Sequence, residues 1–302
     1  MSVIKNVAVA GAAGDLGTPV LNAIVNSGKF NVTVLVRTAG KATFPSSVKE
    51  VEADFTSVSS LTNALKGQDA LVSTVGTSGL QGQTLLIDAS IAAGVSRFIP
   101  SEFGSDLDNP KVGALPVFGY KMAVKKYAEE KASEHPNFSY TNIRNAAFLD
   151  WGLEKSFLLD WASGKPRIYD SGDQLLSATT LATVGQAVVG VLLHPEETKN
   201  RAVRIHDLSI SQNKLLAIAK KISPNRTLEP YHDSTEKIFK GAHDKIAKGD
   251  YSPGVLFEFI ICSLFGEGYG ALHTSEADNK LLGIAGDKSD ADIEAILKPL
   301  LA

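Results

Sequence analysis

The feature that most constrains the fold of this chain is a glycine-rich segment between an apolar run and a helical pattern. Residues Val3–Ala10 form a mainly apolar run, typical of a strand buried on both faces of a parallel sheet. The segment Gly11-Ala12-Ala13-Gly14-Asp15-Leu16-Gly17 follows directly, and apolar side chains then recur at helical spacing up to Gly28. A strand, a tight turn and a helix in this order are the first unit of a doubly wound α/β fold.

Each glycine of this G-x-x-G-x-x-G segment has a physical task. Gly11 allows the tight turn, Gly14 lets the backbone approach a pyrophosphate, and Gly17 lets the helix lie close to the sheet. The helix N-terminus offers free N–H groups and a partial positive charge to phosphates. The alternative is a plain glycine-rich turn, which the flanking strand and helix disfavour. We predict that a dinucleotide is bound here by Gly11, Ala13, Gly14, Asp15, Leu16 and Gly17.

The first half of the chain continues as an alternation of strands and helices. Expected strands are Val32–Val36, Val48–Ala53, Ala70–Val75, Arg97–Pro100 and Ser139–Ile143. Expected helices are one opened by Ser57 or Ser59, one at Leu85–Ala93 that ends at Gly94, and a long one around Pro116–Glu134. This alternation requires right-handed crossovers, so the fold class is α/β, with a Rossmann-type doubly wound parallel sheet.

After about Asn145 the pattern loosens into a smaller, mainly helical C-terminal lobe. Its expected helices are Leu153–Ala162, Leu181–Leu193, Gln212–Ile222, Glu236–Lys248, Pro253–Leu264 and Asp290–Leu300, with short strands around Arg167–Tyr169 and Ala202–Ile205. We therefore divide the chain into an NAD(P)-binding Rossmann domain at 1–150 and a substrate-binding lobe at 151–302, some segments of which return to the Rossmann sheet. A ligand is expected between them, beyond the C-terminal ends of the strands.

The end of the second expected strand bears on the choice between NAD and NADP. An acidic residue there would hold the ribose hydroxyls and repel a 2′-phosphate, but this chain has Arg37, with Lys41 four residues beyond. A guanidinium suits a phosphate, so we predict a preference for NADP(H); the alternative is a solvated surface pair. Two further strand ends supply candidates for cofactor binding. Asp54 and Phe55 are expected to face the adenine, and Thr74, Val75 and Gly76 to lie beside the middle of the cofactor. The alternative is that they are ordinary turn residues.

Few residues offer a catalytic group. The Tyr-x-x-x-Lys spacing of ordinary short-chain dehydrogenases occurs at Tyr127 and Lys131, but this lysine falls near the far end of its helix. The six histidines are scattered without a His-Glu-x-x-His pattern, and no Gly-x-Ser-x-Gly elbow is present. Lys121, in the first turns of the long helix, remains and shares a helix face with Lys125. A second cation and an apolar lid would lower its pKa; otherwise the pair is a solvated basic face.

Several segments resemble one known family. Arg97-Phe98-Ile99-Pro100-Ser101-Glu102-Phe103-Gly104 is similar to a strongly marked segment of isoflavone reductase-like and phenylcoumaran benzylic ether reductase-like proteins, which belong to the NmrA-like atypical short-chain dehydrogenases. Gly11–Gly17, Leu35–Arg37, Ser73–Gly76, Lys121-x-x-x-Lys125-Lys126 and Tyr140–Ile143 with Asn145 agree in the same order. The match covers roughly residues 3–153 well and the remainder only in general.

The resemblance implies an NADPH-dependent reductase in which Lys121 is the general acid/base while the nicotinamide delivers hydride to an aromatic or phenolic substrate. It implies that Lys125 contacts the cofactor; in the plant reductases that position is usually arginine, and lysine keeps the charge but loses the fork. The same superfamily includes NmrA-type regulators that bind dinucleotides without catalysis and act through a protein partner. A general quinone- or aldehyde-type reductase is a third alternative.

The second lobe departs from the plant enzymes, and that lobe shapes the substrate pocket. Its aromatic side chains are either pocket residues or core, and the candidates are Phe148, Trp151, Phe157, Trp161 and Phe257. The phenolic substrate class is therefore expected from the resemblance alone.

Composition restricts the partners of this protein. Thirty Lys and Arg residues against 33 Asp and Glu residues give a net charge of −3, so no chain-wide field attracts nucleic acid or an anionic membrane. The single cysteine, Cys262, excludes a disulfide framework and is expected to be a buried core thiol. No apolar run is long enough for a membrane span and no export signal stands at Met1–Asn6, so we expect a cytoplasmic protein. A monomer or homodimer is expected, although the sequence itself carries no signal for the oligomeric state.

Overall fold

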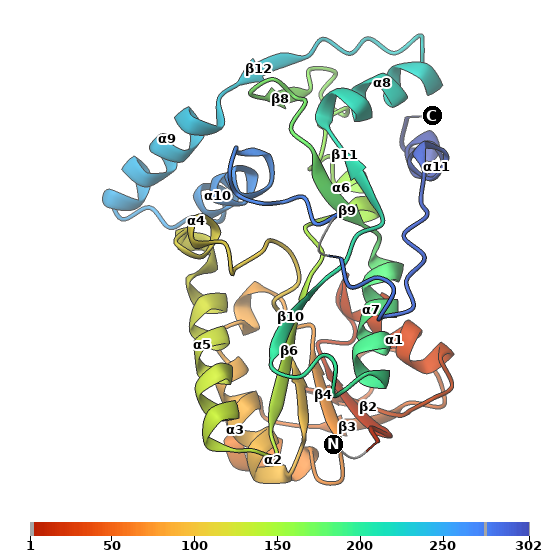
Figure 1. Cartoon of the computed structure of the whole chain (residues 1–302), viewed down its shortest axis with the longest axis vertical. Coiled ribbons are helices and arrows are strands. Elements are labelled where there is room, and N and C mark those ends of the chain that lie inside the picture. Colours follow the sequence, from red (N-terminus) through yellow and green to blue (C-terminus); the bar gives the residue numbers. More distant parts are fainter. Residues whose placement is uncertain (1–2, 275–276, 302) are drawn as a thin grey trace.

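A seven-stranded parallel sheet organises the lower lobe of the molecule (Figure 1). The computed structural model describes residues 3–274 and 277–301. The strand order is β10-β6-β5-β4-β1-β2-β3, and each hydrogen-bonded pair of neighbours is parallel. The strands are β1 (Asn6–Ala10), β2 (Asn31–Val36), β3 (Lys49–Glu52), β4 (Ala70–Ser73), β5 (Arg97–Ile99), β6 (Ser139–Arg144) and β10 (Arg201–Arg204). The order reverses beside β1, which is the switch point where such folds bind ligands.

Helices cover both faces of this sheet (Figure 1). Val7 and Val9 of β1 face a core shared with α1 and α7, whereas Ala8 and Ala10 face a core shared with α2, α3 and α5. This split follows from the alternation of side chains along a strand, which explains why the whole strand is apolar. The helices are α1 (Gly17–Asn26), α7 (Leu181–Leu193), α2 (Val58–Ala64), α3 (Gln83–Ala93) and α5 (Gly119–Glu134).

The upper lobe contains two small sheets in addition to its helices (Figure 1). One sheet has the order β11-β9-β7 and the other pairs β12 with β8. Its strands are β7 (Ala147–Phe148), β8 (Arg167–Tyr169), β9 (Leu176–Thr179), β11 (Leu208–Ile210) and β12 (Tyr231–Asp233). Its helices are α6 (Leu149–Glu154), α8 (Gln212–Ile222), α9 (Thr235–Ala247), α10 (Pro253–Phe265) and α11 (Asp290–Leu301). The short helix α4 (Pro110–Gly113) and the 3₁₀ turns η1 (Thr77–Gly79) and η2 (Pro116–Phe118) complete the described elements.

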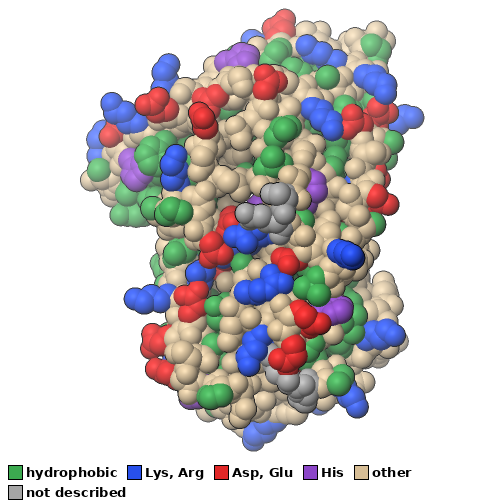
Figure 2. All heavy atoms as spheres, viewed as in Figure 1, with side chains coloured by type: hydrophobic (Ala, Val, Ile, Leu, Met, Phe, Trp, Pro, Cys, Tyr) green, Lys and Arg blue, Asp and Glu red, His purple; other side chains and the backbone are tan. Residues whose placement is uncertain are grey.

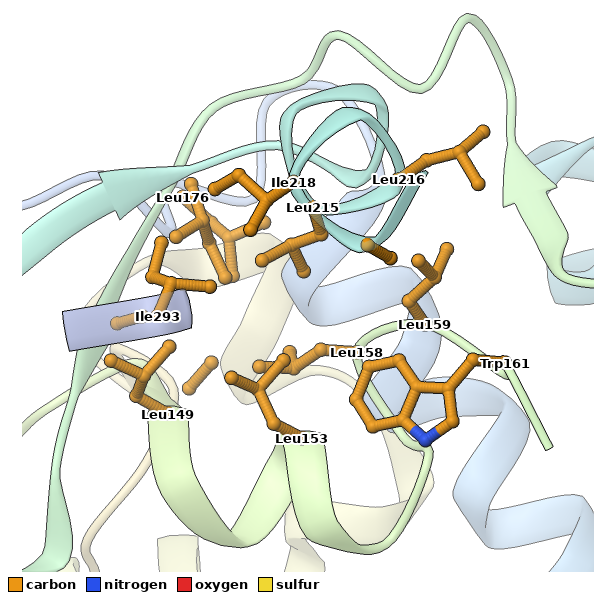
Figure 3. Packing of buried hydrophobic residues seen from close by; sticks show 14 of the residues in the cluster. Leu149, Leu153, Leu158, Leu159, Trp161, Leu176, Leu215, Leu216, Ile218 and Ile293 are labelled. Atoms are coloured by element: carbon orange, nitrogen blue, oxygen red, sulfur yellow. The ribbon is translucent and has the colours of Figure 1, made fainter. Parts of the chain in front are cut away.

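The upper lobe has its own apolar core, in which α6, α8 and α11 converge (Figure 3). Leu153 of α6, Leu215 of α8 and Ile293 of α11 are almost fully buried there. Trp161, from the loop after α6, fills the same core. This tryptophan is therefore a packing residue and not a pocket residue.

The lobes are not consecutive along the chain. Helix α7 and strand β10 both follow residue 150, yet α7 packs against α1 and β10 pairs with β6. The approach of the two helices is close, since a Cβ added to Gly185 would lie 2.8 Å from the Cβ of Ala23. The part of the chain after residue 150 thus contributes one edge strand and one covering helix to the lower lobe.

The parallel sheet and the α/β fold class are confirmed. Two predictions of element boundaries were wrong. The expected helix Leu153–Ala162 ends at Glu154, because Ser156 adopts a positive φ of 54° and Leu158 and Leu159 turn into the core from a loop. The expected strand Ala70–Val75 ends at Ser73. The lobe expected to be mainly helical also contains the strands β7, β9, β11 and β12. Each has at most four residues, which is too few for a periodic signal.

Helix capping explains several element boundaries. Ser57 is the N-cap of α2 and accepts a hydrogen bond from the backbone N–H of Ser60. Gly94 ends α3 in the left-handed conformation with φ 81°, and α5 ends at Glu134, before Pro136. Within residues 3–274 and 277–301, the helices are too short or too polar to cross a bilayer.

Candidate functional site

The glycine-rich loop has the close packing that only glycine allows. Gly11 has φ +84°, and a Cβ there would lie 2.7 Å from the carbonyl carbon of Thr74. A Cβ at Gly17 would lie 2.0 Å from the carbonyl oxygen of Gly11, so the helix can approach the strand only without a side chain. At Gly14 the added Cβ would meet nothing nearer than 3.5 Å, which leaves this stretch of backbone open to a ligand. The N-cap of α1 is Leu16, whose side chain makes no capping hydrogen bond.

Arg37 and Lys41 lie in an exposed loop after β2. The loop between them is held from β3, since Gly40 N donates to Glu50 Oε1 at 2.8 Å and Ala39 N donates to Glu52 Oε2 at 3.1 Å. Within the described ranges neither cation forms an ion pair. Both side chains are therefore available to an anion of the ligand, and their predicted contact with a 2′-phosphate stays a prediction.

The two other predicted strand ends differ in environment. Asp54 is exposed and accepts from Thr56 N at 2.9 Å and Thr56 Oγ1 at 2.7 Å, and these hydrogen bonds hold the pKa of its carboxyl below the usual value. Phe55 is half-buried beside it. Thr74 is buried and bonds through both N and Oγ1 to the carbonyl of Ala10, which ties β4 to β1 next to the glycine loop. A role for Asp54 and Phe55 at the adenine stays a prediction.

A cavity of about 480 Å³ lies beyond the carboxyl ends of β1, β4 and β5, under the upper lobe. The nucleotide side of its wall comes from the glycine loop and the segment after β4, namely Gly14, Asp15, Leu16, Thr74, Val75, Gly76 and Thr77. The rest of the lining is mostly apolar and aromatic, with Phe103, Phe118, Phe148, Trp151, Phe157 and Phe257. Lys121 and Asp15 are the ionisable side chains in the described lining.

Lys121 lies in the first turn of α5 with its side chain directed to the cavity. Its Nζ donates to the carbonyl oxygens of Glu102 at 2.8 Å and Phe103 at 3.1 Å, and lies 5.9 Å from the centre of the Phe118 ring. Burial lowers the pKa of Lys121 from 10.5 to about 8. A lysine with this pKa exchanges its proton near neutral pH, which a general acid/base requires.

Lys125 does not act on Lys121 as expected. Its Nζ forms ion pairs with Asp108 Oδ1 at 3.3 Å and Glu129 Oε1 at 2.7 Å, and Lys125 is not part of the described cavity lining. Burial alone, without a neighbouring cation, therefore lowers the pKa of Lys121, and the predicted cation effect was wrong. The implied contact between Lys125 and a cofactor stays a prediction.

The alternative Tyr-Lys pair is engaged elsewhere. Tyr127 Oη donates to Asp88 Oδ1 at 2.6 Å, which raises the pKa of Tyr127 to about 12, and Lys131 Nζ bonds to Glu134 at 2.7 Å. Neither side chain is part of the described cavity lining. Cys262 is a buried thiol whose pKa burial raises to about 12, so it is a core residue as expected.

Aromatic side chains from the upper lobe form one wall of the cavity. Trp151 contacts Phe157 edge-on with ring centres 6.2 Å apart, and Phe157 contacts Phe257 at 4.9 Å. The Trp151 indole also donates to Asp15 Oδ2 at 3.1 Å, across 136 residues of sequence. The hydrogen bond joins the glycine loop directly to the aromatic wall.

A cluster of charged side chains surrounds Arg144 at the end of β6. Its fully buried guanidinium pairs with Glu102, which is 2% exposed, and lies 3.5 Å from Asp106 and 3.7 Å from Asp108. Arg204, at the end of β10, reaches Asp106 at 2.8 Å and Asp108 at 3.6 Å. Burial and the neighbouring Arg204 lower the pKa of Arg144 to about 9.

The sequence analysis assigned no role to two parts of this site, the backbone carbonyls near Glu102 and the charge network of Arg144. The segment around Glu102 was singled out only for its resemblance, and its carbonyls give no signal because backbone acceptors are common to all residues. Arg144 stands in a strand of mostly polar residues, Ser139–Arg144, and all six positions of that strand are buried. A run of buried polar residues in a central strand was the available signal for a charge network.

A model of the NmrA-like family matches residues 4–248. The chain belongs to the NmrA-like family. Among relatives of this NmrA-like protein, oxidoreductase poxI of Penicillium oxalicum is 34% identical over 297 residues, covering 95% of this chain and 92% of that protein. Oxidoreductase aprR of Aspergillus flavus is 34% identical over 299 residues, covering 97% and 98%. Isoflavone reductase of Cicer arietinum is 28% identical over 270 residues, covering 80% and 82%.

Solved structures share the fold of this NmrA-like protein. AtPrR2 with NADP+ and (+)pinoresinol superimposes with a TM-score of 0.77 at 21% identity, over 98% of this chain and 100% of that one. An isoflavone reductase crystal structure superimposes with a TM-score of 0.74 at 21% identity, over 97% and 99%. The likeness extends through both lobes and confirms the Rossmann-type fold class.

Proposed function

We propose that this NmrA-like protein is an NADP(H)-dependent reductase that transfers hydride to an aromatic or phenolic small molecule, with Lys121 as general acid/base. The observation that carries the proposal is the position of Lys121 in one cavity between the glycine-rich loop and the aromatic wall. The names of its relatives support the reaction class, since poxI and aprR are oxidoreductases. AtPrR2 was solved with NADP+ and (+)pinoresinol, a ligand that supports the aromatic substrate class.

The residues present fit a dinucleotide. The backbone at Gly14 is open, and the close packing at Gly11 and Gly17 brings the N-terminus of α1 to the edge of the cavity. Arg37 would hold the 2′-phosphate and Lys41 would add a second charge. When bound, the reduced nicotinamide supplies a hydride.

Lys121 handles the proton that accompanies reduction. Two of the three ammonium hydrogens bond to the Glu102 and Phe103 carbonyls, so the third is free to point into the cavity. In the reductive direction it donates this proton to the substrate oxygen. Trp151, Phe157 and Phe257 would stack or pack on the substrate ring and exclude water from the reacting atoms.

The first test is a comparative titration of the purified protein with NADPH, NADP+, NADH and NAD+. Marked preference for NADPH over NADH would support the reductase. Preference for oxidised forms regardless of the 2′-phosphate would point instead to a redox-sensing regulator of the NmrA type.

The second test replaces the proposed acid/base. Lys121→Ala should lower turnover by about 10²–10⁴-fold, with NADPH affinity retained, when NADPH oxidation is followed with (+)pinoresinol and a panel of phenols and quinones. Lys126→Ala is the matched control, because Lys126 is an exposed lysine of the same helix. Undiminished turnover in Lys121→Ala would remove the proposed role.

A further inference from the structure

We infer that Glu102 and Arg144 are positioning residues, which fix the two backbone carbonyls that hold the ammonium group of Lys121. The inference rests on the proposed role of Lys121 for its functional meaning. It concerns residues that touch neither the cavity nor the ligand, since neither Glu102 nor Arg144 belongs to the described cavity lining.

The carbonyls that accept from Lys121 belong to consecutive residues whose side chains are anchored in different places. The Glu102 side chain pairs with Arg144 in the interior, whereas Phe103 packs in the apolar core beside β1 and α1. For both carbonyls to face one cation, the chain must turn sharply, and Gly104 does so with φ 135°. The anchoring of Glu102 therefore determines where its carbonyl points.

Arg144 holds the whole segment that contains these carbonyls. Glu102, Asp106 and Asp108 all come from the loop between β5 and α4, and all three approach the one guanidinium. A carbonyl on the same loop, that of Gly104, accepts from Ala146 N at 3.0 Å, which ties the loop to the chain just after Arg144. Arg144, at the end of β6, thus holds the loop between β5 and α4 against the end of the sheet.

The electrostatic surroundings of Lys121 are consistent with a positioning role. The Glu102 carboxylate is neutralised by Arg144, Lys125 is paired with Asp108 and Glu129, and Asp15 bonds to Trp151 across the cavity. Lys121 thus has backbone carbonyls, and no carboxylate, as its described hydrogen-bond partners. Loosening the loop would admit water to the ammonium, and its pKa would rise toward 10.5, the usual value for a solvated lysine.

The experiment compares Arg144→Lys with the wild type in two measurements. This variant keeps the positive charge but loses the planar guanidinium that approaches three carboxylates. The first measurement is a ¹⁵N NMR titration of the Lys121 Nζ, which needs no substrate. The second is NADPH oxidation with the same probes as above. We expect the Lys121 pKa to rise and turnover to fall by about 10-fold, with the Kd for NADPH unchanged. An unchanged or lower Lys121 pKa in folded Arg144→Lys would overturn the inference.

Arg97→Lys is the matched control for a general loss of stability. Arg97 is also fully buried in the sheet, but it bonds to Ser139, Thr141 and Thr198 at the opposite end of the strands. The Arg97→Lys substitution should lower the melting temperature and leave the pKa of Lys121 unchanged. An equal rise of the pKa in Arg97→Lys would show that unspecific loosening causes the effect and would overturn the inference.

Asp108→Glu covers the case in which Arg144→Lys does not fold. Asp108 is 38% exposed at the edge of the cluster, so a change there is tolerated better. The longer side chain keeps the charge but shifts the carboxylate relative to the guanidinium, and a smaller rise of the Lys121 pKa is expected. No rise in that variant would count against the inference. Activity retained in Lys121→Ala would instead remove the proposed function and leave the NMR result standing.

Discussion

The indole nitrogen of Trp151 donates a 3.1 Å hydrogen bond to the carboxylate of Asp15, and this bond joins the two halves of the cavity. Asp15 belongs to the glycine-rich loop, where the phosphates of a dinucleotide are expected, and Trp151 belongs to the aromatic wall. A ligand that occupies the loop therefore meets the same side chain that orients the substrate wall. This relationship makes Trp151 a reporter of nucleotide binding.

Tryptophan fluorescence gives a direct test. The chain has two tryptophans, and Trp161 lies in the core of the upper lobe, so in a Trp161→Phe background the emission comes from Trp151 alone. NADPH should quench that emission by energy transfer, since its nicotinamide would lie in the same cavity. NADPH that binds by calorimetry without quenching would place the nucleotide elsewhere.

Removing the charge of Asp15 should tighten NADPH binding. Asp15→Asn keeps an oxygen that accepts from Trp151 but removes a negative charge beside the expected phosphates. A charge at a helix N-terminus is worth about 0.3–1 kcal/mol, so we expect roughly a 2- to 5-fold lower Kd. Weaker binding in Asp15→Asn would show that the hydrogen bond matters more than the charge.

Arg37 should determine the preference for the 2′-phosphate. One charge-assisted contact contributes roughly 1.5–3 kcal/mol, so Arg37→Ala should weaken NADPH binding about 10- to 100-fold. NADH, which lacks the phosphate, is the control ligand for the same variant and should bind as before. Calorimetric titration with both ligands measures the two effects, and equal loss for both would contradict the assignment.

The pH dependence of reduction should follow the ammonium of Lys121. Its pKa is about 8, and donation of a proton requires the charged form, so kcat/KM should fall as the pH rises through about 8. The profile is measured by NADPH oxidation at saturating NADPH and limiting substrate. A rate that instead increases with pH through that value would assign Lys121 the role of general base.

Acid should destabilise the protein through His273. This histidine is 2% exposed, and burial, with Arg204 nearby, lowers its pKa below 6.5 even though Asp106 opposes the effect. The unfolded chain then binds a proton at a pH where the folded protein does not, so the free energy of unfolding decreases as the pH falls below about 6.5. Above that pH the histidine is neutral in both states and makes no such difference.

Urea unfolding of the wild type and His273→Gln from about pH 7.5 to about pH 5.5 measures this effect. The loss of stability on acidification should be smaller in the variant. His135→Gln is the control, because His135 is 44% exposed. Parallel curves for wild type and His273→Gln would rule out His273 as the cause.

The lower lobe could be predicted because its local signals agree with its global fold. Residues 7–10 of β1 are apolar on both faces, and the strand is followed by a glycine segment whose spacing only a strand-to-helix turn explains. Ser57 and Gly94 cap their helices as their residue types suggest. In such elements the residues that determine the structure are adjacent in the sequence.

The remainder could not be predicted because it depends on contacts between distant residues. Strand β7 has two residues, and only its pairing with β9 makes it a strand. Lys121 was singled out by position and resemblance, but the carbonyls that hold it, and the pairing of Glu102 with Arg144, arise from the fold of three separate segments. The helix expected at Leu153–Ala162 failed for the same reason, since packing into the core overrides local periodicity there.

The chain passes from the lower lobe to the upper lobe and back, and this limits which fragments of the protein can fold. A fragment that stops at residue 150 would lack β10 and α7, so β6 would become an open edge and the apolar side chains on α1 would be exposed to water. Arg97 would also lose Thr198, one of its hydrogen-bond partners. The lower lobe is thus built from segments that are not consecutive in the sequence. To produce it alone, residues 1–150 would have to be joined to the segments that form α7 and β10.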